Sequence, residues 1–353
     1  MSEGPEMKTR ITMSDIARRA GVSKNTVSLA LRNDPQLPEP TRRRLQQLAK
    51  SMGYQKNPTV AHLMAQLRAN QRPGFKACLA LLNANLDPKA FTQHPTVPTY
   101  VSGCRRRAAQ LGYSLDEFWL HDESLDGEKL NKILRSRGIR GIIVLGLMKG
   151  NRLPERFRST WEQFPCVVTG VRPVDPALSF ASSDQYTLGL HAFEKALELG
   201  YRRPALVLDV VIDELVEGRF SAGVLIAQQR LPASCRLKPF YQIQEARQDL
   251  ALFRRWLERE KPDVILTLYN EVRKWVEACG LKVPRDIGLI QLEWRQDRPE
   301  WAGMNQHNDI VGEAATEMIV SMIHNNECGV PAFPRATLVE NSWVAGRTVA
   351  VTS

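Results

Sequence analysis

The sequence contains no uninterrupted apolar run of about 18 residues, the length that spans a bilayer. Its polar start, MSEGPEMKTR, also lacks the apolar core of a signal peptide. The six cysteines lie far apart without a CxxC pair, which argues against a zinc knuckle or a redox motif. We therefore expect a cytoplasmic protein without a membrane partner, whose cysteines are reduced and buried.

Signatures of catalysis are missing as well. The chain has no Walker A loop and no GxSxG, HExxH or GxGxxG stretch, and its six histidines show no metal-ligand spacing. We expect neither an enzyme nor a bound metal or other cofactor.

Positive charge is concentrated at one end of the chain. Residues 1–72 hold 13 Lys and Arg against 5 Asp and Glu, whereas the remaining residues add only +2 to the net charge of +10. A compact basic segment on a nearly neutral body is typical of a nucleic-acid reader attached to another domain. A solvated basic face without a partner is the alternative.

Two short helices separated by a tight turn are predicted within this basic segment. In TMSDIARRA the apolar residues fall on one helical face, and Thr12 or Ser14 is available to cap its start. Gly21 can adopt the positive φ that ends this helix, and Ser23 can cap a second helix over about residues 24–31. The arrangement is a helix-turn-helix, whose second helix enters the major groove of DNA.

Polar side chains stand at the start of the predicted second helix. Lys24 can donate to guanine O6 and N7, and Asn25 can pair with adenine N6 and N7. A third amphipathic helix follows in EPTRRRLQQLAKSMGY, with Arg42 near its start, where a phosphate can be held. For Arg42 a merely solvated position is the alternative.

The stretch TMSDIARRAGVSKNTVSLALRNDPQLPEPTRRRLQQLAKSMGYQKNP resembles, over its whole length, the headpiece of the lactose-repressor (LacI/GalR) family of bacterial transcription regulators. The resemblance implies base-reading positions at Lys24, Asn25 and Leu29. The residue pattern and the resemblance together predict a DNA-contacting set of Ser14, Ser23, Lys24, Asn25, Thr26, Ser28, Leu29 and Arg42.

A hinge helix is implied at NPTVAHLMAQL, residues 57–67. In relatives two such helices meet over the minor groove, and a leucine wedges into a base step. Asn57 and Leu63 match the family's approximate Asn-x-x-Ala-x-x-Leu pattern, whereas Val60 replaces the alanine. The resemblance implies that Asn57 and Leu63 contact DNA. A linker helix without a DNA contact is the alternative.

From residue 75 onward, short apolar runs alternate with amphipathic stretches. The expected strands are ACLALLN, SLDEFWL, GIIVLGL, CVVTGV, PALVLDVV, DVILTLY and IGLIQLEW. The expected helices are TYVSGCRRRAAQLGY, EKLNKILRSRG, YTLGLHAFEKALELGY, GRFSAGVLIAQQRL, LALFRRWLERE and EVRKWVEACG. This alternation predicts parallel, helix-covered sheets, and their total length favours two α/β lobes over a single core.

The resemblance continues, more weakly, to the periplasmic-binding-protein-like effector domain of the same family. FASSDQYTLGLHAFEKALELGYRRPALVLD is similar to the segment that enters the second lobe, and GMNQHNDIVGEAATEMIVSMI to the return crossing. The resemblance implies doubly wound lobes. The implied divisions are a headpiece of 1–56, a hinge of 57–74 and a body of 75–353, with lobe 1 at about 75–180 and 306–334 and lobe 2 at about 181–305 and 335–353.

A ligand site is expected between the lobes, near the carboxyl ends of strands. Asn270 follows DVILTLY, Glu293 follows IGLIQL, and Arg219 precedes FSAGVLIAQQ, while Phe180 is expected as an apolar wall. Relatives place an arginine three residues before the glycine, whereas Arg219 lies four before Gly223. A guanidinium, an amide and a carboxylate suit a sugar or sugar acid. An internal Arg219–Glu293 ion pair is the alternative.

These features predict a transcriptional regulator, with repression of a carbohydrate-related operon as the specific hypothesis. It is expected to bind a pseudo-palindromic double-stranded DNA operator as a homodimer and to respond to a small-molecule effector. The runner-up is an architectural DNA-binding protein whose body dimerises without sensing a ligand. A sugar-modifying enzyme with an attached headpiece ranks third.

Overall fold

A computed structural model of the chain describes residues 11–31, 33–54 and 77–350. The chain divides into two compact units on either side of residue 74, with Met322–Glu327 grouped with the first. No helix among the described residues has the length and apolar character needed to cross a membrane.

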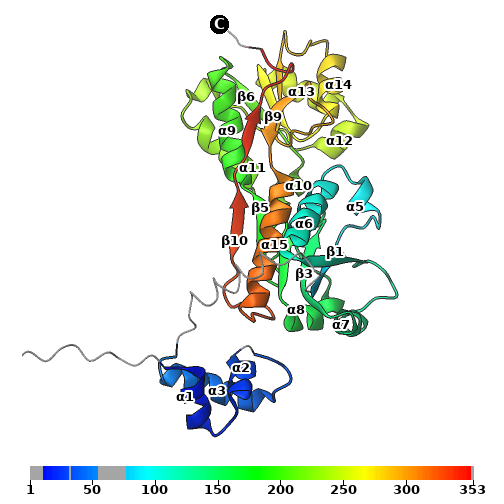
Figure 1. Cartoon of the computed structure of the whole chain (residues 1–353). Helices are drawn as coiled ribbons and strands as arrows, with labels where there is room; N and C mark the ends of the chain where they lie inside the picture. Colours follow the sequence, from blue (N-terminus) through cyan, green and yellow to red (C-terminus); the bar gives the residue numbers. More distant parts are fainter. Residues whose placement is uncertain (1–10, 32, 55–76, 351–353) are drawn as a thin grey trace, which may run out of the picture. The chain divides into compact units, whose positions relative to one another are not determined.

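Short helices around a small apolar core make up the described residues before position 74 (Figure 1). They are α1 (Met13–Ala20), α2 (Lys24–Leu31) and α3 (Glu39–Ser51). Ile16, Ala17, Val27 and Ala49 are buried in this core, and Leu48 and Met52 pack against it. Each helix therefore contributes at least one apolar side chain, as the 3.6-residue periodicity of the sequence predicts.

The first lobe of the second unit contains a six-stranded parallel sheet in the order β10-β5-β4-β3-β1-β2. Its strands are β1 (Ala77–Asn83), β2 (Tyr113–Trp119), β3 (Ile139–Leu145), β4 (Cys166–Thr169), β5 (Ser179–Ser183) and β10 (Ala336–Val339). The helices of this lobe are α5 (Ala90–Gln93), α6 (Val97–Leu111), α7 (Gly127–Ser136), α8 (Arg158–Gln163) and α15 (Asn308–His324), with a 3-10 turn at Glu155–Phe157.

The second lobe contains a five-stranded sheet in the order β11-β9-β8-β7-β6, parallel except for β11. Its strands are β6 (Pro204–Val207), β7 (Val264–Thr267), β8 (Gly288–Gln291), β9 (Ala302–Asn305) and β11 (Ser342–Val344). Its helices are α9 (Gln185–Glu198), α10 (Val210–Leu215), α11 (Arg219–Gln228), α12 (Ile243–Gln248), α13 (Ala251–Glu260) and α14 (Glu271–Ala278), with a 3-10 turn at Ala233–Cys235.

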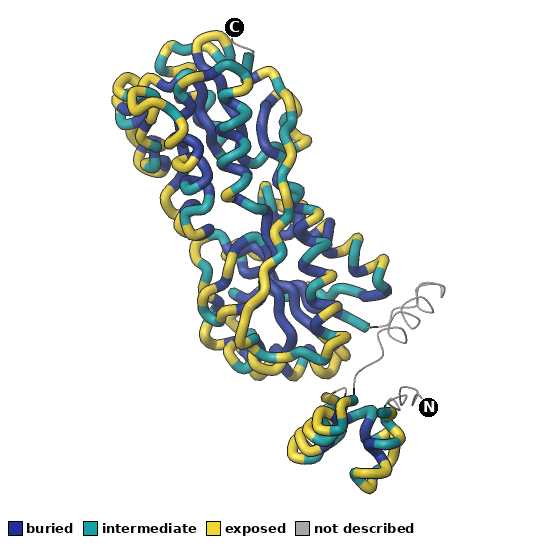
Figure 2. The backbone as a smooth tube through the Cα atoms, turned by 90° about the vertical axis from the view of Figure 1, so that its left-hand side faces the viewer, coloured by how far each residue is buried: buried dark blue, intermediate teal, exposed yellow. Residues whose placement is uncertain are grey.

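The central strands of both lobes are buried and the covering helices face solvent on one side, so the cores follow the sheets (Figure 2). The edge strands β2, β10 and β11 are only partly buried. One apolar cluster runs through both lobes, from Leu82 of β1 to Ile290 of β8. A second cluster lies in the second lobe and includes the rings of Phe240, Phe253 and Trp256, which contact one another edge-to-face or tilted. The α/β architecture with two lobes is thus the one predicted from the sequence.

Two local expectations for the body are wrong. The run PALVLDVV does not stay extended, because β6 ends at Val207 and the Asp209 side chain accepts a hydrogen bond from the Val211 backbone N–H, which starts helix α10. The cysteines form no disulfide among the described residues, but only Cys104 and Cys166 are buried.

Within residues 77–350, the chain crosses between the lobes after β5, after β9 and between β10 and β11. The expected boundary at residue 335 is wrong for 336–339, since β10 pairs with β5 in the first lobe. Likewise β5 continues past the expected boundary at residue 180. An edge strand is defined by its partner, and local sequence does not show that partner.

Glycines allow helices α9 and α11 to approach each other closely. A Cβ on Gly223 would lie 2.2 Å from the backbone oxygen of Tyr186, and a Cβ on Gly189 would lie 2.6 Å from that of Phe220. Neither position has room for a side chain. The contact therefore holds the first turn of α11, including Phe220, at a set distance from α9.

Replacing Gly223 tests this packing. Gly223→Ala should lower the free energy of unfolding by about 1–3 kcal/mol, because the added methyl group overpacks the interface. Denaturant unfolding of the full chain measures the change. Gly150→Ala is the matched control, since a Cβ there would meet nothing within 4 Å. An equal loss in both variants would contradict the proposed contact.

Candidate nucleic-acid interface and interlobe cavity

The turn between α1 and α2 is held by local hydrogen bonds. Thr12 and Asp15 form a capping box, in which the Asp15 backbone N–H donates to Thr12 Oγ1 (3.3 Å) and the Thr12 backbone N–H to Asp15 Oδ2 (2.9 Å). The Thr12 hydroxyl also donates to Asp15 Oδ2 (2.6 Å), and this bond, together with the one from the Thr12 N–H, lowers the pKa of the Asp15 carboxyl. Gly21 ends α1 with a φ of 66°, and the Thr26 backbone N–H donates to Ser23 Oγ (3.0 Å). The predicted helix-turn-helix and the Ser23 cap are confirmed.

The start of α2 presents side chains without partners inside the protein. Lys24 and Asn25 are exposed, and among the described residues neither side chain makes a hydrogen bond or ion pair. Thr26 shares a hydrogen bond of 2.8 Å with Ser23, and Ser28 and Leu29 are half-buried. The structure therefore separates capping residues from two side chains that remain available to a ligand.

Arg42 is expected to face a phosphate, but its guanidinium is used mainly inside the protein. Its Nη1 donates to the backbone oxygen of Asn33 (3.0 Å), and its Nε is buried without a partner in the described part of the chain. Gln46 makes a parallel contact from α3, donating to the Ala30 oxygen at the end of α2 (2.8 Å). Both side chains tie α3 to the segment that follows α2, so Arg42 holds the headpiece loop and only part of its guanidinium is available for a phosphate.

The remaining predicted DNA contacts divide into two groups. Ser14 is exposed on the first turn of α1, where the cap itself is supplied by Thr12. Asn57 and Leu63 lie outside the described residues.

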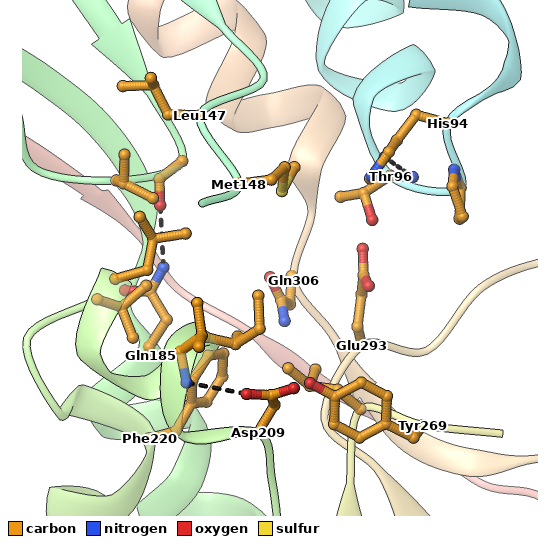
Figure 3. Close-up of a pocket in the computed structure, with 18 of the residues that line it drawn as sticks. His94, Thr96, Leu147, Met148, Gln185, Asp209, Phe220, Tyr269, Glu293 and Gln306 are labelled. Carbon is orange, nitrogen blue, oxygen red and sulfur yellow. Dashed lines mark hydrogen bonds between the residues drawn. The ribbon is translucent and has the colours of Figure 1, made fainter. Parts of the chain in front are cut away.

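A cavity of about 820 Å³ opens between the two lobes of the second unit (Figure 3). Its lining comes largely from the segments that follow strand ends. Leu147 follows β3, Gly170 follows β4, Asp209 follows β6, Tyr269 follows β7 and Glu293 follows β8. Parallel strands deliver the residues after their carboxyl ends to one edge of a sheet, and here the edges of both sheets face the same gap.

Asp209 is the most deeply buried carboxylate of the cavity, with 4% of its surface exposed. Its oxygens accept hydrogen bonds from the Val211 backbone N–H (2.9 Å) and from Gln244 Nε2 (2.5 Å). Tyr269 lies beside it, and the Tyr269 hydroxyl is buried without a partner within the described residues. Burial, reinforced by the negative charge of Asp209, raises the pKa of Tyr269, so this hydroxyl stays protonated and able to donate.

Glu293 lies on the same side of the cavity and is paired. Arg295 Nη2 donates to Glu293 Oε2 (2.6 Å) and to Thr96 Oγ1 (3.0 Å), which joins the second lobe to the first. Asn308 Nδ2 donates to the other Glu293 oxygen (3.2 Å). Burial lowers the pKa of His94 against the opposing effect of Glu293, so the imidazole is favoured as neutral.

The opposite side of the cavity is mainly apolar, with Gln185 as a polar residue on it. In Figure 3, Leu147 and Phe220 lie across the cavity from His94, Thr96, Glu293 and Tyr269. The apolar lining residues are Leu147, Met148, Val171, Val211, Ile212, Leu215, Val216, Phe220 and Leu268. Most of them come from α10, α11 and the segment between these helices.

The structure brings two of the four predicted ligand residues together. Asn270 and Glu293 line the cavity, and Asn270 Oδ1 accepts a hydrogen bond from Gln291 Nε2 (2.8 Å). Arg219 and Phe180 do not line it, and the alternative Arg219–Glu293 ion pair does not form either. Phe220, three residues before Gly223, faces the cavity in place of Arg219 because successive helix residues point about 100° apart.

Several lining residues were missed from the sequence. Asp209 follows the strand PALV as closely as Asn270 follows its own strand, so the strand-end signal applied to Asn270 and Glu293 also marks Asp209. Tyr269 directly precedes Asn270. His94 and Thr96 carry no comparable signal, since they lie in an irregular connection between α5 and α6.

An ion pair bridges the lobes at the rim of the cavity. Arg172, in the connection after β4, lies 3.3 Å from Glu217, in the connection before α11. The Arg172 guanidinium also lies over the Phe180 ring, 5.5 Å from its centroid, and Glu217 lies 3.7 Å from Arg219. Phe180 and Arg219 therefore contact this interlobe pair rather than the cavity.

Comparison with known proteins gives a consistent picture. Residues 12–57 match the family described as "Bacterial regulatory proteins, lacI family". The HTH-type transcriptional regulator MalR of Streptococcus pneumoniae serotype 4 (strain ATCC BAA-334 / TIGR4) is 23% identical over 197 residues, so the match spans 56% of this chain and about half the length of that relative (56%).

Solved structures share the fold over nearly the whole chain. A transcriptional regulator CelR-cellobiose complex has a TM-score of 0.57 at 19% identity and covers 96% of this chain and 100% of its own. The lac repressor dimer bound to operator and the anti-inducer ONPF has a TM-score of 0.55 at 17% identity, covering 97% and 100%. At these identities the likeness is one of fold.

The interlobe ion pair can be measured directly. Because Arg172 and Glu217 are both partly exposed, their coupling should stabilise the chain by about 0.2–1 kcal/mol. A double-mutant cycle with Arg172→Met, Glu217→Gln and the double variant, read by denaturant unfolding, gives this value. Glu214→Gln is the matched control, since Glu214 is exposed on α10 and has no ion pair among the described residues. Strictly additive effects of Arg172→Met and Glu217→Gln would show that the pair contributes nothing.

Proposed function

From the premise that residues 12–57 belong to the lacI family of bacterial regulatory proteins, we propose that the chain is a DNA-binding transcriptional regulator controlled by a small molecule. The observation that carries the proposal is the combination, in one chain, of a capped recognition helix with free polar side chains and a ligand-sized cavity between two lobes. Its place of action is the chromosome, so we expect it in the cytoplasm. We propose no catalytic role.

Sequence reading is assigned to the start of α2. Lys24 and Asn25 supply a cation and an amide, the groups that pair with guanine and adenine edges in the major groove. Thr26, Ser28 and Leu29 follow on the same short helix, and Ser14 lies on the first turn of α1. We propose that these residues contact the operator, with Arg42 acting chiefly as a positioning residue through the Asn33 carbonyl.

A homodimer on a pseudo-palindromic operator is the proposed assembly. Each chain carries one helix-turn-helix, and one recognition helix reads only a half-site. The lac repressor structure that shares the fold is of a dimer bound to operator. We propose repression as the mode of regulation, with Asn57 and Leu63 as the minor-groove contacts between paired headpieces.

Regulation follows from differential affinity. The cavity is lined by both lobes, so a ligand in it can make different contacts when the lobes are arranged differently. The ligand then stabilises the arrangement in which its contacts are stronger. We propose that the favoured arrangement changes the spacing of the two headpieces and thereby the affinity for the operator.

The ligand is proposed to carry hydroxyl groups, as a sugar does, and the regulated genes to be carbohydrate-related. The solved relative in complex with cellobiose supports a saccharide-like ligand for this fold. Asp209, Asn270 and Glu293 supply the acceptors and amide that hydroxyl groups require. The case for a sugar acid is weaker than the sequence suggested, because Arg219 lies outside the cavity.

An architectural protein that dimerises without a ligand is the second candidate. The cavity disfavours it, because a body that served only for dimerisation would have no need of a buried carboxylate facing an open space.

Selection of bound duplexes from a random DNA pool tests the function. The full chain should enrich symmetric sites, and its affinity should fall by orders of magnitude between low and moderate salt, because each phosphate contact adds about 0.9 to the log–log slope. Lys24→Ala and Asn25→Ala should each relax the preference at one base pair by about 1–3 kcal/mol.

Lys50→Ala is the control for these variants, because Lys50 is exposed at the far end of α3 and should leave the base preference unchanged. A flat salt response, or unaltered base preference in both α2 variants, would refute the proposed reading face. Asymmetric enriched sites would refute the proposed dimer.

A further inference from the structure

The apolar side of the cavity restricts what can occupy it. Leu147, Val171, Leu215, Val216 and Phe220 are each less than one-tenth exposed and line the cavity together. A hydroxyl group placed against such a wall loses its hydrogen bonds to water and finds no partner, which costs about 1–3 kcal/mol for each group. A compound with hydroxyl groups on every side therefore fits this wall poorly.

Phe220 is fixed in this position by the packing of its helix. The glycine contacts between α9 and α11 involve the Phe220 backbone itself, and the whole residue is only 3% exposed. Phe220 is consequently part of the second lobe's packed core, while Leu147 and Val171 complete the wall from the first lobe. A ligand gains free energy there only by burying hydrocarbon, at about 0.8 kcal/mol for each CH₂ group.

The polar side of the cavity is deep and acidic. Asp209 has no Lys, Arg or His within ion-pair distance in the described part of the chain, and its charge is stabilised only by hydrogen bonds. The unpartnered Tyr269 hydroxyl lies beside it. A buried carboxylate without a counter-ion favours a ligand group that donates hydrogen bonds, whether a hydroxyl or an ammonium, and disfavours a ligand carboxylate.

The basic lining residues do not reverse this preference. Arg295 is paired with Glu293, Arg298 lies 3.9 Å from Asp297, and Lys149 is exposed. The cations are therefore paired or close to solvent, while Asp209 is deep in the cavity.

We propose that the effector is amphipathic, with a hydrocarbon or aromatic body against the Phe220 wall and a hydrogen-bond-donating head at Asp209 and Tyr269. The inference rests on the proposed function, because it specifies the ligand of the same cavity. It narrows the ligand from a fully hydroxylated sugar to a molecule with one apolar end.

Matched pairs of small molecules test the inference by thermal shift of the full chain. The probes are hexyl β-glucoside against methyl β-glucoside, and hexylamine against methylamine, with hexanoate as the probe whose head carries the opposite charge. A ligand that binds only the folded state raises the melting temperature. At least one hexyl donor should raise it more than its methyl counterpart, and hexanoate should raise it less than that hexyl donor.

Two valines on α10 provide a matched pair of variants. Val211 and Val210 are each 44% exposed, but only Val211 lines the cavity. Val211→Asn should weaken binding of the effective hexyl donor by about four- to fifteenfold, the loss expected from one or two buried CH₂ equivalents. Val210→Asn should leave it unchanged. The comparison separates binding in the cavity from adsorption of a hexyl chain elsewhere.

Several results would overturn the inference. Equal shifts from the methyl and hexyl probes, equal effects of the two variants, a shift from hexanoate that matches the effective hexyl donor, or no shift from either hexyl donor would each do so. DNA selection is read independently of these probes. A chain that selects symmetric operators but fails the probe test retains the proposed function without the amphipathic effector, whereas failure of DNA selection refutes the function itself.

Discussion

The convergence of strand ends from two sheets on a single gap is the constraint on which the cavity depends. Strands β6, β7 and β8 of the second lobe deliver Asp209, Tyr269 and Glu293 to one side, and β3 and β4 of the first lobe deliver the segments opposite. The strands of a parallel sheet run in the same direction, so they all end at the same edge of the sheet. The polar residues that follow these strands therefore gather at that edge. A molecule bound there must contact both lobes, which is the physical requirement for coupling binding to interlobe movement.

The two cavity carboxylates are stabilised in different ways. Glu293 is neutralised by Arg295, and the same arginine donates to Thr96 in the other lobe, so this pair joins the lobes in the absence of a ligand. Asp209 has hydrogen bonds but no cation, and its burial carries a desolvation cost that a donating ligand group would offset. Glu293 therefore already has a counter-ion inside the protein, whereas Asp209 is the carboxylate that we propose for ligand recognition.

A similar division of roles appears in the headpiece. The side chains of Thr12, Asp15 and Ser23 form hydrogen bonds that cap helix starts. Those of Arg42 and Gln46 donate to backbone oxygens at and beyond the end of α2. The side chains of Lys24 and Asn25 form no hydrogen bond within the described residues. The hydrogen-bonded turn fixes the backbone from which these two side chains project, and a fixed backbone reduces the entropy that binding of a partner there would cost.

The sequence by itself determined the helix-turn-helix, the two-lobed α/β body and the cavity positions of Asn270 and Glu293, because caps, periodicity and strand ends are local signals. Only the tertiary structure decided that Phe220 rather than Arg219 faces the cavity. One residue along a helix rotates a side chain by about 100°, and the rotation of α11 is set by its contact with α9. The same holds for β10, whose lobe depends on its pairing with β5. Contacts with residues that are distant in the chain determine these features, and a short stretch of local sequence does not include those residues.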